Sequence, residues 1–110
     1  MDLGNTRIKE LPSDLKFDGD LDLTSTSIKE LPSGLKVRGS LFLEDTPITS
    51  LPDNLEVGGY LGLRHTPIIS LPSDLKVGGN LDLRGTWISK EYTQEQLKKM
   101  LPNVKGKIYI

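Results

Sequence analysis

Residues 57–71, VGGYLGLRHTPIISL, decide the fold, because their pattern recurs along the chain at a fixed interval. The shared pattern is L-x-L-x-x-T-x-I-x-x-L-P-x-x-L-x-V-x-G-x, which spans 20 residues. Self-similarity at a fixed period of roughly 20 to 50 residues is the signature of a repeat architecture. The period can be followed in the threonines, at Thr6, Thr26, Thr46, Thr66 and Thr86, and in the proline of each Leu-Pro pair, at Pro12, Pro32, Pro52 and Pro72.

The period predicts a single β-rich solenoid domain covering residues 1–110, with repeats at about 1–20, 21–40, 41–60, 61–80 and 81–110. In residues 37–43 small and apolar positions alternate with variable ones, which is typical of a strand buried on one face. Stacked coils place such strands side by side in a parallel sheet, with Leu41 and Leu43 inside and Phe42 and Glu44 outside. The Leu-Pro segment should be extended or a single helical turn, because proline lacks a backbone donor.

Two sets of small residues, each at the same position in successive repeats and here called a column, are expected to have a structural role. Each threonine hydroxyl should hydrogen-bond backbone in the turn that follows the strand. The glycine column allows either close approach of neighbouring backbones or a bulge, and the sequence leaves both interpretations open. Its members are Gly19, Gly39, Gly59, Gly79 and Gly106.

The C-terminal end breaks the period. Thr93 followed by Gln96 forms a capping-box pattern, which predicts a capping helix over residues 93–101 that ends before Pro102. Leu97, Met100 and Leu101 would form its apolar stripe. Residues 104–110 then repeat the strand pattern, so that the last coil is longer than the others.

The segments LDLTSTSI (residues 21–28) and LGLRHTPI (residues 61–68) resemble the leucine-rich repeat signature L-x-L-x-x-N-x-L. The short period and the Leu-Pro pairs are similar to the bacterial and phage type of these repeats. Threonine at the asparagine position and the V-x-G segment depart from that signature. The resemblance implies a right-handed leucine-rich-repeat superhelix with a parallel β-sheet on one face, a C-terminal helix-strand cap and a protein-binding function.

Charge and composition argue against several classes of function. The net charge is −1; residues 1–55 hold six basic against ten acidic side chains, and residues 56–110 hold eight against five. Such a dipolar chain lacks the basic excess of a general nucleic-acid binder. It has no cysteine, no apolar run long enough for a membrane span and no signal-peptide pattern, so we expect a cytoplasmic protein without a membrane partner.

Catalytic, metal and cofactor sites are not expected. His65 is the only histidine, and no nucleophile or acid stands at a spacing that would build a catalytic arrangement with it. The glycine-rich residues 58–62 open a strand instead of the helix that a phosphate loop requires. Asp18, Asp20 and Asp22 would alternate on one strand, where an acidic surface patch is favoured over a calcium site because the alternate residues are widely spaced.

The outward face of the sheet is the predicted site of function, since solenoids bind through this extended surface. An aromatic centre with a charged rim is the usual make-up of a protein contact. The residues predicted to bind a partner protein are Phe42, Glu44, Asp45, Tyr60, Arg64, His65, Asp82, Arg84 and Trp87.

The predicted function is therefore non-enzymatic binding of a partner protein, in a phage or prophage protein that acts on a host protein. The alternative is a structural module that self-associates: the N-terminal end has no cap in the sequence, and an exposed sheet edge invites pairing in a homodimer. A ubiquitin-ligase effector, which also carries such repeats, would need a catalytic cysteine.

Overall fold

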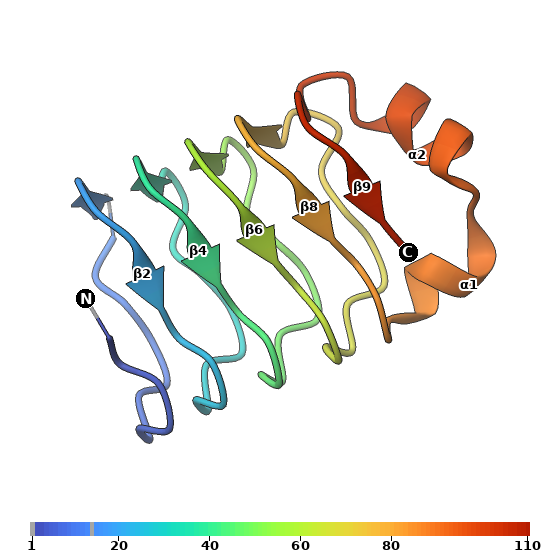
Figure 1. The fold of residues 1–110 in the computed structure, drawn as a ribbon. Helices are drawn as coiled ribbons and strands as arrows, with labels where there is room; N and C mark the ends of the chain where they lie inside the picture. The colour runs from blue at the N-terminus through green and yellow to red at the C-terminus, as the bar shows by residue number, and fades with distance from the viewer. Residues whose placement is uncertain (1, 14) are drawn as a thin grey trace.

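The chain folds into a parallel β-solenoid whose coils stack along one axis (Figure 1). A computed structural model describes residues 2–13 and 15–110. Its principal sheet has five strands in the order β2-β4-β6-β8-β9. Their bounds are Leu21–Asp22 (β2), Leu41–Phe42 (β4), Leu61–Gly62 (β6), Leu81–Asp82 (β8) and Ile108–Tyr109 (β9).

A second parallel sheet lies on another side of each coil and has the order β1-β3-β5-β7. Its strands are Lys16–Phe17 (β1), Lys36–Val37 (β3), Glu56–Val57 (β5) and Lys76–Val77 (β7). In both sheets the partners are 20 residues apart, as in Leu61↔Leu81 and Val57↔Val77. The final pair, Leu81↔Ile108, is 27 residues apart, which confirms the register and the longer last coil.

The single strand predicted over residues 37–43 is wrong, because the chain bends within it and its two halves join different sheets. The bend lies at the glycine column. Gly59 N donates to Gly39 O at 2.9 Å, and Gly79 N donates to Gly59 O at 3.0 Å. A Cβ atom on Gly79 would lie 3.0 Å from the backbone of Gly59. Glycine therefore permits close approach of neighbouring coils at this corner, which decides between the two interpretations left open by the sequence.

The interior is aliphatic and formed by the repeated apolar positions. In the second coil Leu21, Leu23, Ile28, Leu35 and Val37 are all buried, and their equivalents in the next two coils are buried as well. Burial of each such side chain contributes about 1.5–3 kcal/mol before the entropic cost. The Leu-Pro segments contain no helix, as expected.

The threonine column closes the turn after each principal strand. Thr66 is buried, and its hydroxyl donates to the carbonyl oxygen of Leu63 at 2.9 Å. Equivalent hydrogen bonds are made by Thr6, Thr26, Thr46 and Thr86, so the predicted structural ladder is confirmed. The residue before each threonine has a positive φ, including Asp45 at 57° and His65 at 58°. That conformation favours glycine and short polar side chains over β-branched ones.

The C-terminal cap consists of α1 (Trp87–Glu91), α2 (Gln94–Met100) and β9. Thr93 caps α2 and forms both bonds of the capping box with Gln96, as predicted. The predicted apolar stripe is only partly right, since Leu97 and Leu101 are buried whereas Met100 is 43% exposed. Helix α1 was not predicted. It takes the place of the extended return segment in a coil where Glu91 and Tyr92 stand at the position of the repeated Leu-Pro pair, and the Thr86 hydroxyl accepts from Ser89 N at its start.

Candidate binding face

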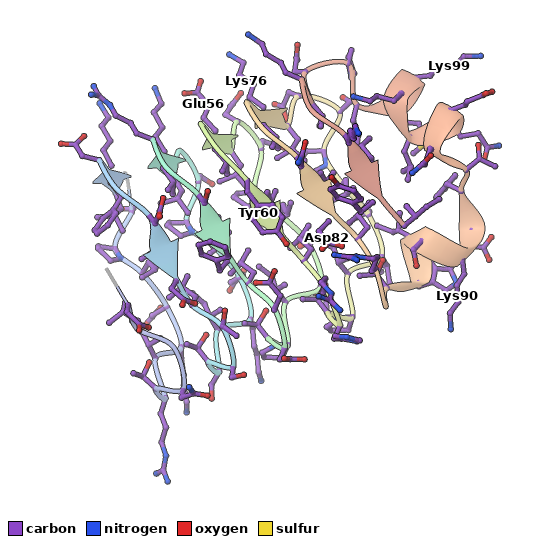
Figure 2. The ribbon with its side chains drawn as sticks, in the orientation of Figure 1. Glu56, Tyr60, Lys76, Asp82, Lys90 and Lys99 are labelled. Atoms are coloured by element: carbon purple, nitrogen blue, oxygen red, sulfur yellow. The ribbon has the colours of Figure 1, made fainter. Side chains whose placement is uncertain are left out.

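The face of the five-stranded sheet carries a pair of aromatic rings. Phe42 is the second residue of β4, and Tyr60 directly precedes β6. Their ring centroids are 5.5 Å apart with the planes tilted by 40°, and both side chains are half-buried. Figure 2 shows Tyr60 lying across β6 with Asp82 beside it.

The Tyr60 hydroxyl lies between two carboxylates. It donates to Glu44 Oε2 at 3.0 Å and is also 3.2 Å from Asp82 Oδ2. Burial raises the pKa of Tyr60 well above its usual value, and the negative charges of Glu44 and Asp82 raise it further. Tyr60 therefore remains a neutral hydrogen-bond donor throughout the physiological pH range.

Asp82 lies inside this cluster, not on its surface. It is 1% exposed, although its position in the period predicted an outward residue available to a partner. Its Oδ1 accepts from Arg84 N at 3.1 Å and from Arg84 Nε at 3.0 Å, and its Oδ2 accepts from Arg84 Nη2 at 2.7 Å. Burial alone would raise the pKa of Asp82, but the hydrogen bonds and charge of Arg84 outweigh burial and lower it. Asp82 thus positions Arg84.

Arg84 is held from two sides. Besides binding Asp82, its guanidinium carbon lies 5.5 Å from the centroid of the Tyr109 ring in β9, a cation–π geometry. The Tyr109 hydroxyl in turn accepts from Asn80 Nδ2 at 3.5 Å. The hydrogen bonds and charge of Asp82 raise the pKa of Arg84. The exposed guanidinium is therefore held in one position by Asp82 and Tyr109.

Arg64, one strand away, has a different environment. Its Nε atom lies 4.0 Å from Asp82 Oδ2, too far for a hydrogen bond, and is buried without an acceptor. The side chain as a whole is 43% exposed. Arg64 therefore lies beside Arg84 near the same carboxylate, but only Arg84 is bound to it.

The remaining predicted residues lie around this centre. Asp45 and His65 are exposed in the turns after β4 and β6, and the His65 ring lies against Gly85, where a Cβ would come 2.6 Å from Nδ1. Trp87 is 50% exposed in the first turn of α1 and makes no ring contact within residues 2–13 and 15–110. The structure thus brings together Phe42, Tyr60, Glu44, Asp82, Arg84 and Arg64, with Asp45, His65 and Trp87 at the periphery.

The prediction omitted three residues that shape the site. Tyr109 in β9 contacts Arg84, and Asn80, which directly precedes β8, donates to the Tyr109 hydroxyl; both residues stand at outward positions of the repeat. Gly62 leaves room for the ring of Tyr60: a Cβ there would overlap Glu44 Oε2 and lie 2.7 Å from Tyr60 Cε1. The sequence contains a signal for this role: Gly62 stands at the repeat position that Phe42 and Asp82 occupy in the neighbouring strands.

The three aspartates considered for calcium do not share one strand, because the chain bends at Gly19. Asp18 Oδ1 lies 3.5 Å from Arg38 Nε, Asp20 accepts from Ser40 N, and Asp22 accepts from Thr24 N in the turn after β2. In the described part of the chain, no group of three or more acidic, histidine or cysteine side chains is placed to hold a metal ion. Within the same residues, neither helix has the length and apolar character needed to cross a membrane.

Fold and face together define a class: a parallel β-solenoid of 20-residue repeats with a helical C-terminal cap and an aromatic, charged cluster on its principal sheet. A comparison of the chain with protein-family models, curated proteins and solved structures finds no match.

Proposed function

We propose that this protein is a non-enzymatic interaction module that binds a partner protein through the face of its five-stranded sheet. The observation that carries the proposal is the Phe42–Tyr60 pair, two aromatic rings in contact and half-exposed on that face. The scaffold does not require aromatic residues there, since glycine or aspartate takes the Phe42 position in neighbouring strands. Aromatic and arginine side chains dominate the binding energy of protein interfaces, especially where they are already held in position.

The second sheet offers a weaker candidate. Its outward residues are mainly lysines that pair with glutamate across the strands, for example Lys76 Nζ with Glu56 Oε1 at 3.4 Å (Figure 2). Such exposed pairs are screened by solvent and contribute little to stability. The proposed interface is therefore the face of β4, β6 and β8.

The proposal extends to the setting in which the protein acts. The resemblance of its repeats to the bacterial and phage type of leucine-rich repeat favours a phage or prophage protein that binds a host protein in the cytoplasm. The Leu-Pro pairs and the short period are the features that support this assignment.

Affinity capture from bacterial lysate, followed by mass spectrometry, tests the proposed interface. Wild-type protein should retain a specific partner that Phe42→Ala loses. Ile69→Ala is the matched control, because Ile69 is 63% exposed and also apolar but lies in the return segment of its coil. Equal capture by wild type and Phe42→Ala, with both folded by circular dichroism, would contradict binding through this face.

Self-association is the second candidate, favoured by a separate observation at the other end of the solenoid. The apolar side chains of the first coil are only partly buried, whereas their equivalents in the next coils are buried except for Leu71. A second copy could cover this end and complete both sheets. The side chains concerned are Leu3, Ile8, Leu11, Leu15 and Phe17.

Sedimentation analysis across a range of protein concentrations tests this candidate. Self-association predicts a dimer that Leu11→Lys dissociates, because a charged side chain at the joint would be buried without a partner. A wild-type protein that remains monomeric at high concentration would rule it out.

A further inference from the structure

We propose that Arg64 is a carboxylate-binding residue, and that the partner contributes an aspartate or glutamate side chain to it beside the Phe42–Tyr60 pair. This inference rests on the proposed function and specifies the chemistry of the partner. It follows from the contrast between Arg64 and its neighbour Arg84.

The hydrogen-bonding capacity of Arg64 is unused. A guanidinium has five N–H donors, yet the nearest carboxylate oxygen, Asp82 Oδ2, lies 4.0 Å from Arg64 Nε. Nε is buried with no acceptor, and the terminal nitrogens have none among the described residues. The side chain is nevertheless 43% exposed, so the free donors at the end of the guanidinium can be reached by an acceptor from outside.

The surrounding carboxylates are already engaged. Both oxygens of Asp82 accept from Arg84, and Oδ2 also contacts the Tyr60 hydroxyl. Glu44 lies in the turn after β4, where its Oε2 accepts from Tyr60, and it forms no ion pair with Arg64 or with any other described residue. Among the described residues Arg64 therefore has only the 4.0 Å ion pair with Asp82, and a carboxylate that hydrogen-bonds to it has to come from a partner.

The geometry favours a carboxylate over a phosphate. Arginine binds a planar carboxylate through two parallel hydrogen bonds. A doubly charged phosphate would meet stronger repulsion from Glu44 and Asp82, both of which contact Tyr60 beside Arg64. The adjoining aromatic rings give the apolar stem of an acidic side chain a surface on which to pack.

The test uses a random heptapeptide library selected on immobilised wild-type protein. Peptides that lose binding to Phe42→Ala are retained, since these occupy the proposed face. They should be enriched in aspartate or glutamate, and replacing that acid by its amide should weaken binding to the wild type about tenfold, which corresponds to about 1.4 kcal/mol. The same replacement should have no effect on binding to Arg64→Gln.

Two further variants separate ion pairing from a purely structural role. Arg64→Lys keeps the charge without the two-pronged geometry, so its affinity should fall between those of wild type and Arg64→Gln. Glu44→Gln can still accept from Tyr60 but removes a negative charge next to the bound acid. It should tighten binding of the acidic peptide, an effect opposite in sign to that of Arg64→Gln.

The outcomes distinguish the inference from the proposed function. Peptides that depend on Phe42 but bind Arg64→Gln as tightly as wild type, or show no preference for acidic residues, would overturn the inference and leave the proposed function standing. If no selected peptide depends on Phe42, both are overturned. Thermal melting of each variant confirms that the fold is intact.

Discussion

Single residues on the sheet face are constrained by one another as much as by the repeat. Gly62 has no side chain, so the side chains of Tyr60 and Glu44 occupy the space above it. The Tyr60 hydroxyl in turn contacts Asp82. Asp82 becomes a buried carboxylate that is hydrogen-bonded to Arg84, while Arg64 lies 4.0 Å from it without a hydrogen bond. The variable positions of this solenoid therefore form a connected network, and a substitution at one of them alters the position of the next.

Asp82 should give the protein an acid-sensitive stability. Its pKa is lowered in the folded state, so its contribution to stability is present above the pKa of an unfolded aspartate, near ~3.9, and is lost as the pH falls below it. Chemical denaturation at pH 7 and at pH 3 should show that Asp82→Asn removes about 1–3 kcal/mol at neutral pH and much less in acid.

Asp45→Asn is the matched control for this experiment, because Asp45 is exposed in the turn after β4 and forms no ion pair within the described residues. It should leave the difference in stability between the two pH values unchanged. A loss for Asp82→Asn that is the same at both pH values would show that the side chain acts through its shape instead of its charge.

Among the structural elements, the corner between the two sheets is the feature that the sequence left undetermined. Alternation across residues 37–43 is compatible with one continuous strand, whereas in the structure the chain bends at the glycine column. Gly19 and Gly79 occupy equivalent positions in different surroundings. A Cβ on Gly19 would meet nothing within 4 Å, whereas one on Gly79 would lie 3.0 Å from the Gly59 backbone.

Alanine at these two glycines should therefore have opposite consequences. Gly79→Ala should destabilise the protein by about 1–3 kcal/mol, since it forces neighbouring coils apart. Gly19→Ala should be neutral or stabilising by up to about 1 kcal/mol, because it restricts only the unfolded chain. Urea denaturation of both variants measures the difference; equal losses would mean that coil spacing does not depend on this column.

The parts of the fold that repeat could be predicted, and the parts that depend on contacts between different coils could not. The period predicted the strand pairing and the threonine ladder, and the spacing of Thr93 and Gln96 predicted the capping box. It did not predict the burial of Asp82, which depends on Tyr60 from the preceding coil and Arg84 from its own. Helix α1 was missed because the motif that excludes a helix elsewhere is simply absent there.

As a whole molecule, the solenoid is a one-dimensional stack in which each coil contacts only its neighbours, and its two ends are unequal. The cap covers the last coil: α2 packs against β9, and Gln94 Nε2 donates to Ile108 O at 2.9 Å. The first coil leaves its apolar side chains partly exposed. Stability in such a stack is approximately a sum of coil and interface terms, so it should be lowest at the N-terminal end.

Substitutions at two equivalent isoleucines test whether stability is lower at the N-terminal end than in the middle of the solenoid. Ile68 is fully buried between coils, whereas Ile8 in the first coil is only partly buried. Ile68→Ala should cost about 2–5 kcal/mol, and Ile8→Ala should cost distinctly less because its cavity opens to solvent. Hydrogen exchange adds the spatial information: amides of the first coil should exchange fastest, and Ile8→Ala should accelerate exchange there without affecting β8 and β9. If Ile8→Ala costs as much as Ile68→Ala and accelerates exchange throughout, the first coil folds cooperatively with the rest, and its apolar side chains are covered in solution.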